Sequence, residues 1–451
     1  MSKYNVLYLD LSIYFVEMRC LEKVLLIFPK TGLDIYAQLP LGLLSIASTI
    51  VDDYEVNIID QRIDKDWAEK VESESQNSIC VGITSMTGEQ ISNGLEISKI
   101  AKKNVVWGGV HPTILPEQTL ENKHIDFIVV GEGEITFPLL IKALKNQNKL
   151  NNIKGVGYKD SYGIHINEPP NNVNLNNLPD LPYYLLDMDK YITKRDGFQR
   201  CLTLETSRGC PHNCSFCSNP VIHNRKWRSL NVDNIMRKVN YLNNEYNLDG
   251  IIFQEDNFFV NIQRVEEFCE KISINNIGWK SNCRIKYLLD KDQTFFKMLE
   301  NAGCKMLQFG VESGSDRILN LLNKGITTDD IIKINKKLAN ANILCRYNFI
   351  IGIPTETEKE IQATLDFIEK LKSENANLDS PFLNIYTPWP GTKLYDLAVK
   401  NGFNPPNSLE GWSKFNWNSY NLPWLSEKTS KFLEEISKKY RNENKYFSNH
   451  K

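Results

Sequence analysis

The sequence of 451 residues has no excess of either charge and only six histidines. Its 53 basic and 55 acidic side chains give a net charge of -2, which offers no general attraction to nucleic acid or to an anionic membrane. The most apolar stretch, Leu39 to Val51, is interrupted by Pro40 and Gly42 and is shorter than the ~20 residues that a membrane-spanning helix needs. Asp10 interrupts the first apolar residues, which therefore make a poor secretory signal. We expect a cytoplasmic protein without a transmembrane segment and without a stable nucleic-acid partner.

Two common nucleotide-binding signatures are also missing. No G-x-G-x-x-G follows the first clear strand, and no G-x-x-x-x-G-K-[ST] occurs in the chain, so dinucleotide and P-loop sites lack support. Ten cysteines are present, but a reducing cytoplasm does not favour a disulfide framework. Seven of them are scattered through apolar patterns, where a small buried side chain is the usual role. The other three form one tight cluster.

The first third of the chain has the pattern of an α/β domain. Residues 23–147 alternate β-branched runs such as "KVLLIF", "SICVGITS" and "NVVWGG" with amphipathic stretches such as "GEQISNGLEISKIAKK". This alternation predicts a parallel, doubly wound sheet with helices on both faces. Ligands of such sheets bind beyond the carboxyl ends of the strands, and Gly, Ser and Thr are concentrated there in this sequence.

A second βα series begins at residue 201, after an Asn- and Pro-rich connector, "NEPPNNVNLNNLPDLPYY", that cannot form a helix or a central strand. Six strands, each followed by a helix, predict a partial (β/α)6 barrel with its chemistry at the C-terminal strand ends. The expected division is an N-terminal extension (1–22), a first domain (23–170), a linker (171–200), the barrel (201–425) and a charged C-terminal helix (426–451).

The cysteine cluster lies in "LETSRGCPHNCSFCSNP", directly after the first strand of the predicted barrel. Its thiols, Cys210, Cys214 and Cys217, have the spacing C-x3-C-x2-C. A zinc ion needs four tetrahedral ligands, and only His212 could complete a set here, since no second cysteine pair is nearby. Three thiols on one loop instead suit an iron-sulfur cluster that keeps one iron open for another ligand. A structural zinc knuckle remains the alternative.

With Phe216 before the third thiol, this stretch resembles the radical S-adenosylmethionine (SAM) superfamily, whose signature is C-x3-C-x-aromatic-C. The resemblance implies a [4Fe-4S] cluster on the three cysteines, with SAM chelated at the open iron and cleaved to a radical that abstracts hydrogen. It also implies that polar groups after successive strands hold SAM, with the ribose at Glu312 and the SAM carboxylate at Arg284. The SAM-binding residues matched in this way are Phe216, Glu255, Asp256, Asn257, Arg284, Glu312, Ser313, Gly352 and Pro354.

The first domain resembles the cobalamin-binding domain that is fused to radical SAM enzymes in the cobalamin-dependent subfamily. The resemblance rests on "VGITSMTGEQI", "VVWGGVHPTILPEQTL" and "IDFIVVGEGEITF". None of the six histidines lies in a D-x-H-x-x-G motif, so cobalamin would bind without a histidine on cobalt. Glycines would let the corrin and its nucleotide tail approach the backbone. The implied cobalamin-binding residues are Thr84, Ser85, Thr87, Gly108, Gly109, His111, Gly131 and Glu132; an empty domain is the alternative.

The resemblance leaves several functions open and assigns no catalytic residue. The first is a C-methyltransferase that uses one SAM to methylate cobalamin and a second to make the radical on an unactivated carbon. The second is an oxidative cyclase or rearrangement enzyme similar to the anaerobic protoporphyrin ester cyclases. The third is a radical enzyme with an empty first domain that modifies RNA or protein. We expect a small-molecule or peptide substrate and a reducing electron donor of the flavodoxin or ferredoxin type.

Overall fold

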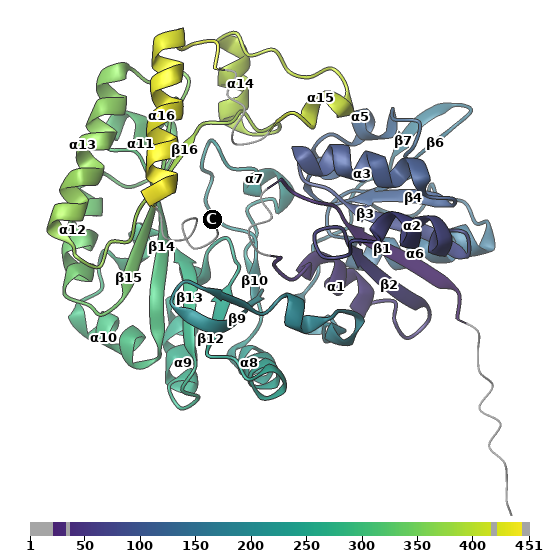
Figure 1. Ribbon diagram of the computed structural model, residues 1–451, viewed down its shortest axis with the longest axis horizontal. Helices are drawn as coiled ribbons and strands as arrows, with labels where there is room; N and C mark the ends of the chain where they lie inside the picture. Colours follow the sequence, from purple (N-terminus) through teal and green to yellow (C-terminus); the bar gives the residue numbers. More distant parts are fainter. Residues whose placement is uncertain (1–20, 33–36, 416–421, 444–451) are drawn as a thin grey trace, which may run out of the picture.

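The computed structural model describes residues 21–32, 37–415 and 422–443. They form two lobes that lie side by side, each built on its own seven-stranded sheet (Figure 1). The expected extension 1–22 falls almost wholly outside the described residues, as do residues 444–451 of the expected C-terminal helix. No helix in the described part of the chain is long and apolar enough to cross a bilayer.

The first lobe has the strand order β2-β1-β3-β4-β5-β6-β7, in which β1 to β5 are parallel and β6 and β7 form an antiparallel hairpin at the edge. The strands are β1 (Lys23–Phe28), β2 (Glu55–Asp60), β3 (Ser78–Thr84), β4 (Asn104–Gly108), β5 (Phe127–Val129), β6 (Val156–Asp160) and β7 (Gly163–Ile166).

Alternate residues of β1 explain why helices cover both faces of this sheet. Val24 and Leu26 join one core with α1 (Leu41–Ser48) and α6 (Gly133–Asn146). Leu25 and Ile27 join another with α2 (Trp67–Ser75), α3 (Glu89–Ile100) and α5 (Pro116–Leu120). Side chains of a strand point alternately to opposite faces, so an uninterrupted apolar strand needs cover on both. The predicted doubly wound sheet is confirmed.

The second lobe is a curled, open half-barrel with the strand order β16-β15-β14-β13-β12-β9-β8. Its six parallel strands are the six predicted ones, and β8 is an antiparallel edge strand. The bounds are β8 (Thr193–Arg195), β9 (Phe198–Leu204), β12 (Gly250–Phe253), β13 (Gly278–Cys283), β14 (Cys304–Glu312), β15 (Leu344–Ile351) and β16 (Phe382–Ile385).

Helices cover the outside of the half-barrel (Figure 1). Outward-facing Trp279, Phe309 and Tyr347 are fully buried in the core between the strands and these helices. Residues that alternate with them, Lys280, Asn282, Gln308 and Arg346, line a cavity inside the half-barrel. The neighbouring strands add the apolar Ile252 and Phe382 to this lining. The main helices are α8 (Val232–Tyr246), α9 (Ile262–Ile272), α10 (Gln293–Asn301), α11 (Asp316–Leu321), α12 (Thr328–Ala339), α13 (Glu358–Glu374) and α16 (Glu427–Glu443).

Two segments connect the lobes. The stretch expected as a linker contains three short 3-10 turns, η1 (Leu175–Asn177), η2 (Tyr183–Leu185) and η3 (Met188–Lys190), and then β8 of the second sheet. Near the other end of the barrel, the chain leaves α14 (Lys393–Lys400) and returns to the first lobe at α15 (Leu409–Trp412), beside α3 and α5 (Figure 1). There the Trp412 indole N–H donates to Gln118 Oε1 at 2.6 Å.

Candidate functional site

The cysteine loop runs from residue 209 to 218, between the two-residue strand β10 (Ser207–Arg208) and α7 (Asn219–Ile222). Backbone hydrogen bonds hold its middle to the barrel: Ser215 N–H donates to Leu322 O at 2.9 Å, and Leu394 N–H donates to Ser215 O at 2.7 Å. The loop is therefore fixed at the C-terminal ends of the barrel strands, where the sequence predicted the chemistry.

The three thiols lie in a partly buried environment with hydrogen-bond donors close by. Arg284 Nη1 donates to Cys214 Sγ at 2.9 Å, and the Asn219 N–H donates to Cys217 Sγ at 3.4 Å. Burial raises the pKa of Cys210, and it raises the pKa of Cys217 to about 12. Thiols of this kind are poor nucleophiles when free, and a bound metal would supply the positive charge that favours their ligand form.

His212 does not complete a zinc site with these thiols. Its Nε2 lies 2.8 Å from the Tyr287 hydroxyl, and burial lowers its pKa to about 4, so the ring is neutral and already partnered. Among the described residues, no three His, Cys, Asp or Glu side chains converge closely enough to hold one metal ion. A cubane cluster has no such requirement, because each thiolate binds a different iron. The donor set therefore fits the cluster better than a single zinc ion.

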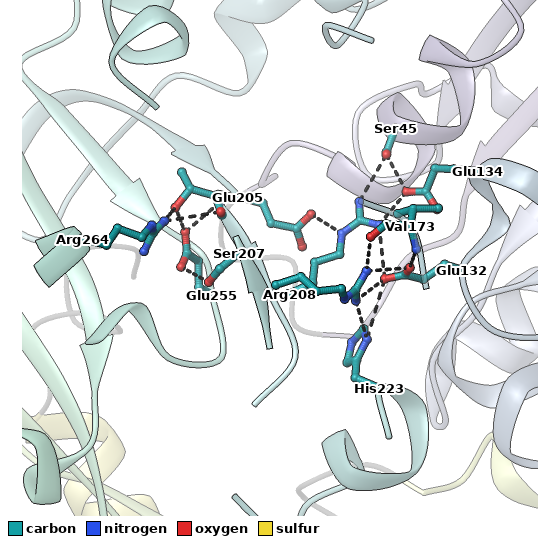
Figure 2. A network of polar contacts seen from close by, with 12 residues as sticks. Ser45, Glu132, Glu134, Val173, Glu205, Ser207, Arg208, His223, Glu255 and Arg264 are labelled. Atoms are coloured by element: carbon teal, nitrogen blue, oxygen red, sulfur yellow. Dashed lines mark hydrogen bonds and ion pairs between the residues drawn. The ribbon is translucent and has the colours of Figure 1, made fainter. Parts of the chain in front are cut away.

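The acidic stretch after β12 brings two of its three predicted SAM-binding residues to the cavity. Asp256 and Glu255 both line the cavity described below. Glu255 also accepts hydrogen bonds from Thr206 and Ser207, directly before the cysteine loop (Figure 2). Asn257 caps the short turn that follows, where its Oδ1 accepts from the Phe259 N–H at 3.2 Å. Glu255 thus braces the start of the cysteine loop at the cavity wall, Asn257 caps the following turn, and Asp256 lines the cavity.

Glu312, the predicted ribose ligand, ends β14 in a strained conformation with φ +75°, at a register shift against β15. It is buried and pairs with Lys324 Nζ at 2.9 Å. A Cβ at Gly310 would lie 2.3 Å from the Glu312 carboxylate, so this strand leaves room for the pair only because residue 310 is glycine. Lys324 Nζ is 5.7 Å from the Phe216 ring centre, and its carbonyl accepts from Arg284.

Lys324 therefore joins three residues that the sequence placed separately near SAM. Sequence reasoning missed this lysine, because "LLNKGITT" has no signal beyond a loop after a helix. Ser313, in contrast, is buried among other partners: its hydroxyl lies 3.2 Å from Thr364 Oγ1 and accepts from the Ser315 N–H. Its place favours a structural contact at the start of α11.

The turn after β15 contains two predicted SAM-binding residues, Gly352 at φ +77° and Pro354. The Gly352 N–H donates to Glu356 Oε2 at 2.6 Å, and its carbonyl accepts from the Trp424 indole at 3.1 Å. Glu356 is 6% exposed. Burial raises the pKa of Glu356 to about 7, although the Ile353 and Gly352 N–H groups oppose the rise.

This carboxyl predicts a pH-dependent stability. The folded chain binds the Glu356 proton more tightly than the unfolded chain, whose pKa is near 4.5, so the stabilisation is complete below about pH 4.5 and is lost as the pH rises through about 7. The shift of the Glu356 pKa from 4.5 to about 7 corresponds to a loss of about 3 kcal/mol in the free energy of unfolding. Glu356→Gln keeps the acceptor for both N–H groups but should flatten the decline in melting temperature between pH 5 and 7.5. Glu121→Gln, at an exposed position, is the control, and equal slopes in all three proteins would contradict the prediction.

A cavity of about 740 Å³ lies between the lobes and continues into the half-barrel. Thr84, Gly108, Gly109, Gly131 and Glu132 of the predicted cobalamin set line it. Ser85, Thr87 and His111 are not part of the lining: Ser85 is buried, and Thr87 Oγ1 lies 2.9 Å from His111 Nδ1. His111 is fully buried, which lowers its pKa to about 4.

The part of the cavity inside the first lobe is apolar. Leu26, Val106, Val129 and Phe137 line it between the sheet and the α1 and α6 helices. A Cβ at Gly82 would lie 2.8 Å from Leu26 Cδ2, so the absence of a side chain there keeps this part open. We call this part the apolar slot; its lining fits a flat aromatic group such as the nucleotide tail of cobalamin.

A network of charged side chains connects the lobes at the edge of this cavity (Figure 2). Arg208, two residues before the first cluster cysteine, has a side chain 12% exposed and contacts Glu134 at 2.6 Å, Glu205 at 2.7 Å and Glu132 at 3.6 Å. Ser45 of α1 donates to Glu134 at 2.6 Å. The cysteine loop and the strand-end loop of the first lobe are thus held together directly.

Arg228 adds a bidentate contact to the same network. Its Nη1 and Nη2 donate to the two oxygens of Glu132 at 2.9 and 2.7 Å. Burial alone would raise the pKa of Glu132, but Arg228 and Arg208 hold it below its usual range. The Val173 N–H also donates to this carboxylate at 2.8 Å. Glu132, one of the predicted cobalamin-binding residues, is therefore engaged by arginines at the interface between the lobes.

Comparison with known proteins matches each lobe to a known domain family. A family model of the radical SAM superfamily matches residues 204–368, and a model of the B12 binding domain matches residues 36–141. An uncharacterized methyltransferase of Pyrococcus horikoshii is 35% identical over 398 residues, which cover 84% of this chain and 83% of the relative. An anaerobic magnesium-protoporphyrin IX monomethyl ester cyclase of Synechocystis is 27% identical over 372 residues, which cover 80% of this chain and 72% of the relative.

Two solved structures share the two-lobed fold. The radical SAM methyltransferase TsrM of Kitasatospora setae, with cobalamin and a [4Fe-4S] cluster bound, aligns with a TM-score of 0.68 at 17% identity, over 87% of this chain and 81% of that one. The cobalamin-dependent radical SAM enzyme OxsB aligns with a TM-score of 0.66 at 24% identity, over 77% of this chain. The match covers 52% of OxsB, so this chain spans about half the length of that enzyme.

With both domain types present and a relative that matches over most of its length, the chain belongs to the cobalamin-binding radical SAM enzymes.

Proposed function

We propose that this enzyme is a C-methyltransferase that acts on an unactivated carbon. The observation that carries the proposal is a cavity whose walls come from both lobes, because a methyl group on cobalamin and a substrate radical made at the cluster must meet in one space. The uncharacterized methyltransferase of Pyrococcus horikoshii, which matches 84% of this chain, supports methyl transfer as the type of reaction.

In this proposal Cys210, Cys214 and Cys217 hold a [4Fe-4S] cluster, and SAM lies between it and the barrel. Asp256 and Arg284 are placed to bind the charged groups of SAM, since Asp256 lines the cavity and Arg284 contacts a cluster thiol. Glu312 would accept from the ribose, with Lys324 holding its carboxylate in place. The bound cluster and SAM together supply the radical that removes hydrogen from the substrate.

Cobalamin would lie over Gly108, Gly109 and Gly131, with its tail in the apolar slot of the first lobe. The rest of the chain then serves to orient the reactants and to exclude water, which would quench reactive species. The α14 to α15 segment and the Arg208 network close two sides of the interface between the lobes.

A radical cyclase is the second candidate, because the Synechocystis cyclase matches 80% of this chain. The two reactions differ in the fate of the SAM methyl group. A methyltransferase places it on a carbon of the product, whereas a cyclase or rearrangement enzyme adds no methyl group.

The experiment uses the anaerobically reconstituted enzyme, a reductant, an extract of the source cell and SAM that carries deuterium on its methyl group. Mass spectrometry should find the label on carbon in a small molecule or peptide, together with 5'-deoxyadenosine. Enzyme with Cys210→Ala is the matched control and should give neither product. If 5'-deoxyadenosine accumulates while no carbon gains the label, the methyltransferase proposal fails and the cyclase candidate replaces it.

A further inference from the structure

The turn that follows α7 lies against the cysteine loop. A Cβ at Gly209, the residue before the first cluster cysteine, would collide with the Lys226 carbonyl, so the turn can pack here only because residue 209 is glycine. Arg225 Nε donates to the Pro211 carbonyl of the loop at 3.2 Å. Asn224 and Arg225 have φ values of +50° and +58°, which residues other than glycine rarely adopt. This strained turn places two exposed cations, Arg225 and Lys226, beside the loop.

A third exposed cation, Lys286, flanks the loop from the barrel. It lies in η5 (Ile285–Leu288), directly after β13. The next residue, Tyr287, has its hydroxyl 2.8 Å from His212 Nε2 in the middle of the loop. Burial lowers the pKa of His212, and the charges of Lys286 and Arg225 add to this effect, so both cations lie near the middle of the loop. We call Arg225, Lys226 and Lys286 the basic rim.

No carboxylate of the described residues neutralises the basic rim. In that part of the chain, Lys226 and Lys286 make no side-chain hydrogen bond or ion pair, and Arg225 contacts only a backbone carbonyl. The whole chain has a net charge of -2, so the rim is a local excess of positive charge on a protein without one overall.

The acidic residues close to the loop have other positions. Glu312 is buried in its ion pair with Lys324, and Glu255 is buried under the start of the loop. Asp256 lines the cavity between the lobes, which no residue of the basic rim does. Negative charge therefore faces the cavity, whereas positive charge is exposed outside it.

The cysteine loop is itself partly open to solvent beside the rim. Pro211, His212 and Asn213 are only half-buried, as are Cys210 and Cys217. A protein that covered this surface would come close to the cluster ligands without entering the cavity, which would stay free for the substrate. Electron tunnelling falls steeply with distance, so a redox partner gains most by docking here.

We propose that the basic rim docks a small acidic protein that donates single electrons to the cluster. With reduced flavodoxin as the donor, one electron passes from the anionic flavin hydroquinone to the [4Fe-4S]²⁺ state, which becomes [4Fe-4S]⁺; no bond changes and no proton moves. Opposite charges steer such partners together, and interfaces between redox partners are small enough for three cations to matter. The inference rests on the cluster, which methyl transfer and cyclisation both need, and not on methyl transfer itself.

The first test measures binding, so it does not depend on turnover. The anaerobically reconstituted enzyme is titrated into oxidised flavodoxin that carries a fluorescent label. The double variant Lys226→Glu with Lys286→Glu should bind at least about tenfold more weakly at low salt. Raising the salt from about 25 to about 200 mM should weaken binding to the unaltered enzyme and change binding to the variant much less.

Lys103→Glu with Lys305→Glu is the matched control, because it makes the same change of charge away from the loop. Both lysines are exposed and have no side-chain partner among the residues described, and each lies at the N-terminal end of its strand region, before β4 and in β14. This double variant should bind flavodoxin as tightly as the unaltered enzyme.

The second test follows cluster reduction by the loss of visible absorption. Reduction by flavodoxin hydroquinone should slow in the rim variant as its affinity falls, whereas reduction by dithionite, which needs no docking surface, should keep its rate. The proposal is overturned if the two double variants bind flavodoxin alike, if salt has no effect, if dithionite reduction slows equally, or if a short single-stranded RNA binds the rim more tightly than flavodoxin does. Failure of deuterium transfer alone would leave this result unaffected.

Discussion

Cys210→Ala is expected to remove the iron-sulfur cluster and all turnover while cobalamin affinity stays unchanged. The thiol lies on the loop held by the barrel, whereas the apolar slot and its glycines belong to the first lobe. A cubane with only two protein thiolates is poorly held, so iron should fall from about four atoms per chain to background. Iron analysis and the visible spectrum of added cobalamin measure the two sites independently.

Cys269→Ala is the matched control, because Cys269 is a buried thiol of α9 in the same lobe but outside the loop. It should keep its iron and lose only modest stability. Loss of both cofactors in Cys210→Ala, with cobalamin retained in Cys269→Ala, would mean that the two sites are not separable as described.

Gly108→Leu should produce the opposite loss, of cobalamin with the cluster retained. Gly108 lies at the end of β4 on the cavity side, and an added Cβ would meet only Val129, at 3.9 Å. The leucine side chain would therefore fill empty space and leave the protein's own packing intact. Overfilling a site costs about 1–3 kcal/mol, so cobalamin should bind roughly 10- to 100-fold more weakly. Cobalamin titration followed by visible absorption measures the affinity.

Gly108→Ala supplies the control for this position, since one methyl group finds room and should change the affinity little. Iron content should be normal in both variants. If Gly108→Leu binds cobalamin as tightly as the unaltered chain, the corrin and its tail do not occupy the glycine-lined mouth of the slot.

Much of the fold could be predicted because it depends on local patterns. The uninterrupted apolar β1 requires cover on both faces, and the six strand-helix units after residue 201 each carry their own signal. The three thiols could be predicted for the same reason, because their spacing is contained in eight residues of one loop.

Features that depend on the folded arrangement could not be predicted in this way. Lys324 lies twelve residues after Glu312 in the sequence. The two become partners only because the chain returns toward the cysteine loop after α11. The sequence around Glu132 would be the same whether its carboxylate bound a cofactor or Arg228. Only the packing of the two lobes shows that it pairs with Arg228. Burial of His111 likewise follows from the return of α15, which brings Trp412 to a ring-centre distance of 6.3 Å from it.

The Arg208 network also limits how this enzyme can be rebuilt from parts. Arg208 and the first cluster cysteine are separated by one glycine, while their acidic counterparts Glu132 and Glu134 lie on the "GEGE" turn of the other lobe. A chimera that joined this barrel to a foreign first domain without that turn would leave Arg228 without its carboxylate partner and Arg208 with Glu205 alone. Removing one partner of a buried ion pair is commonly destabilising. The segment around Arg208 and the "GEGE" turn therefore depend on each other. Exchange of domains between such enzymes should succeed only where both segments are transferred together.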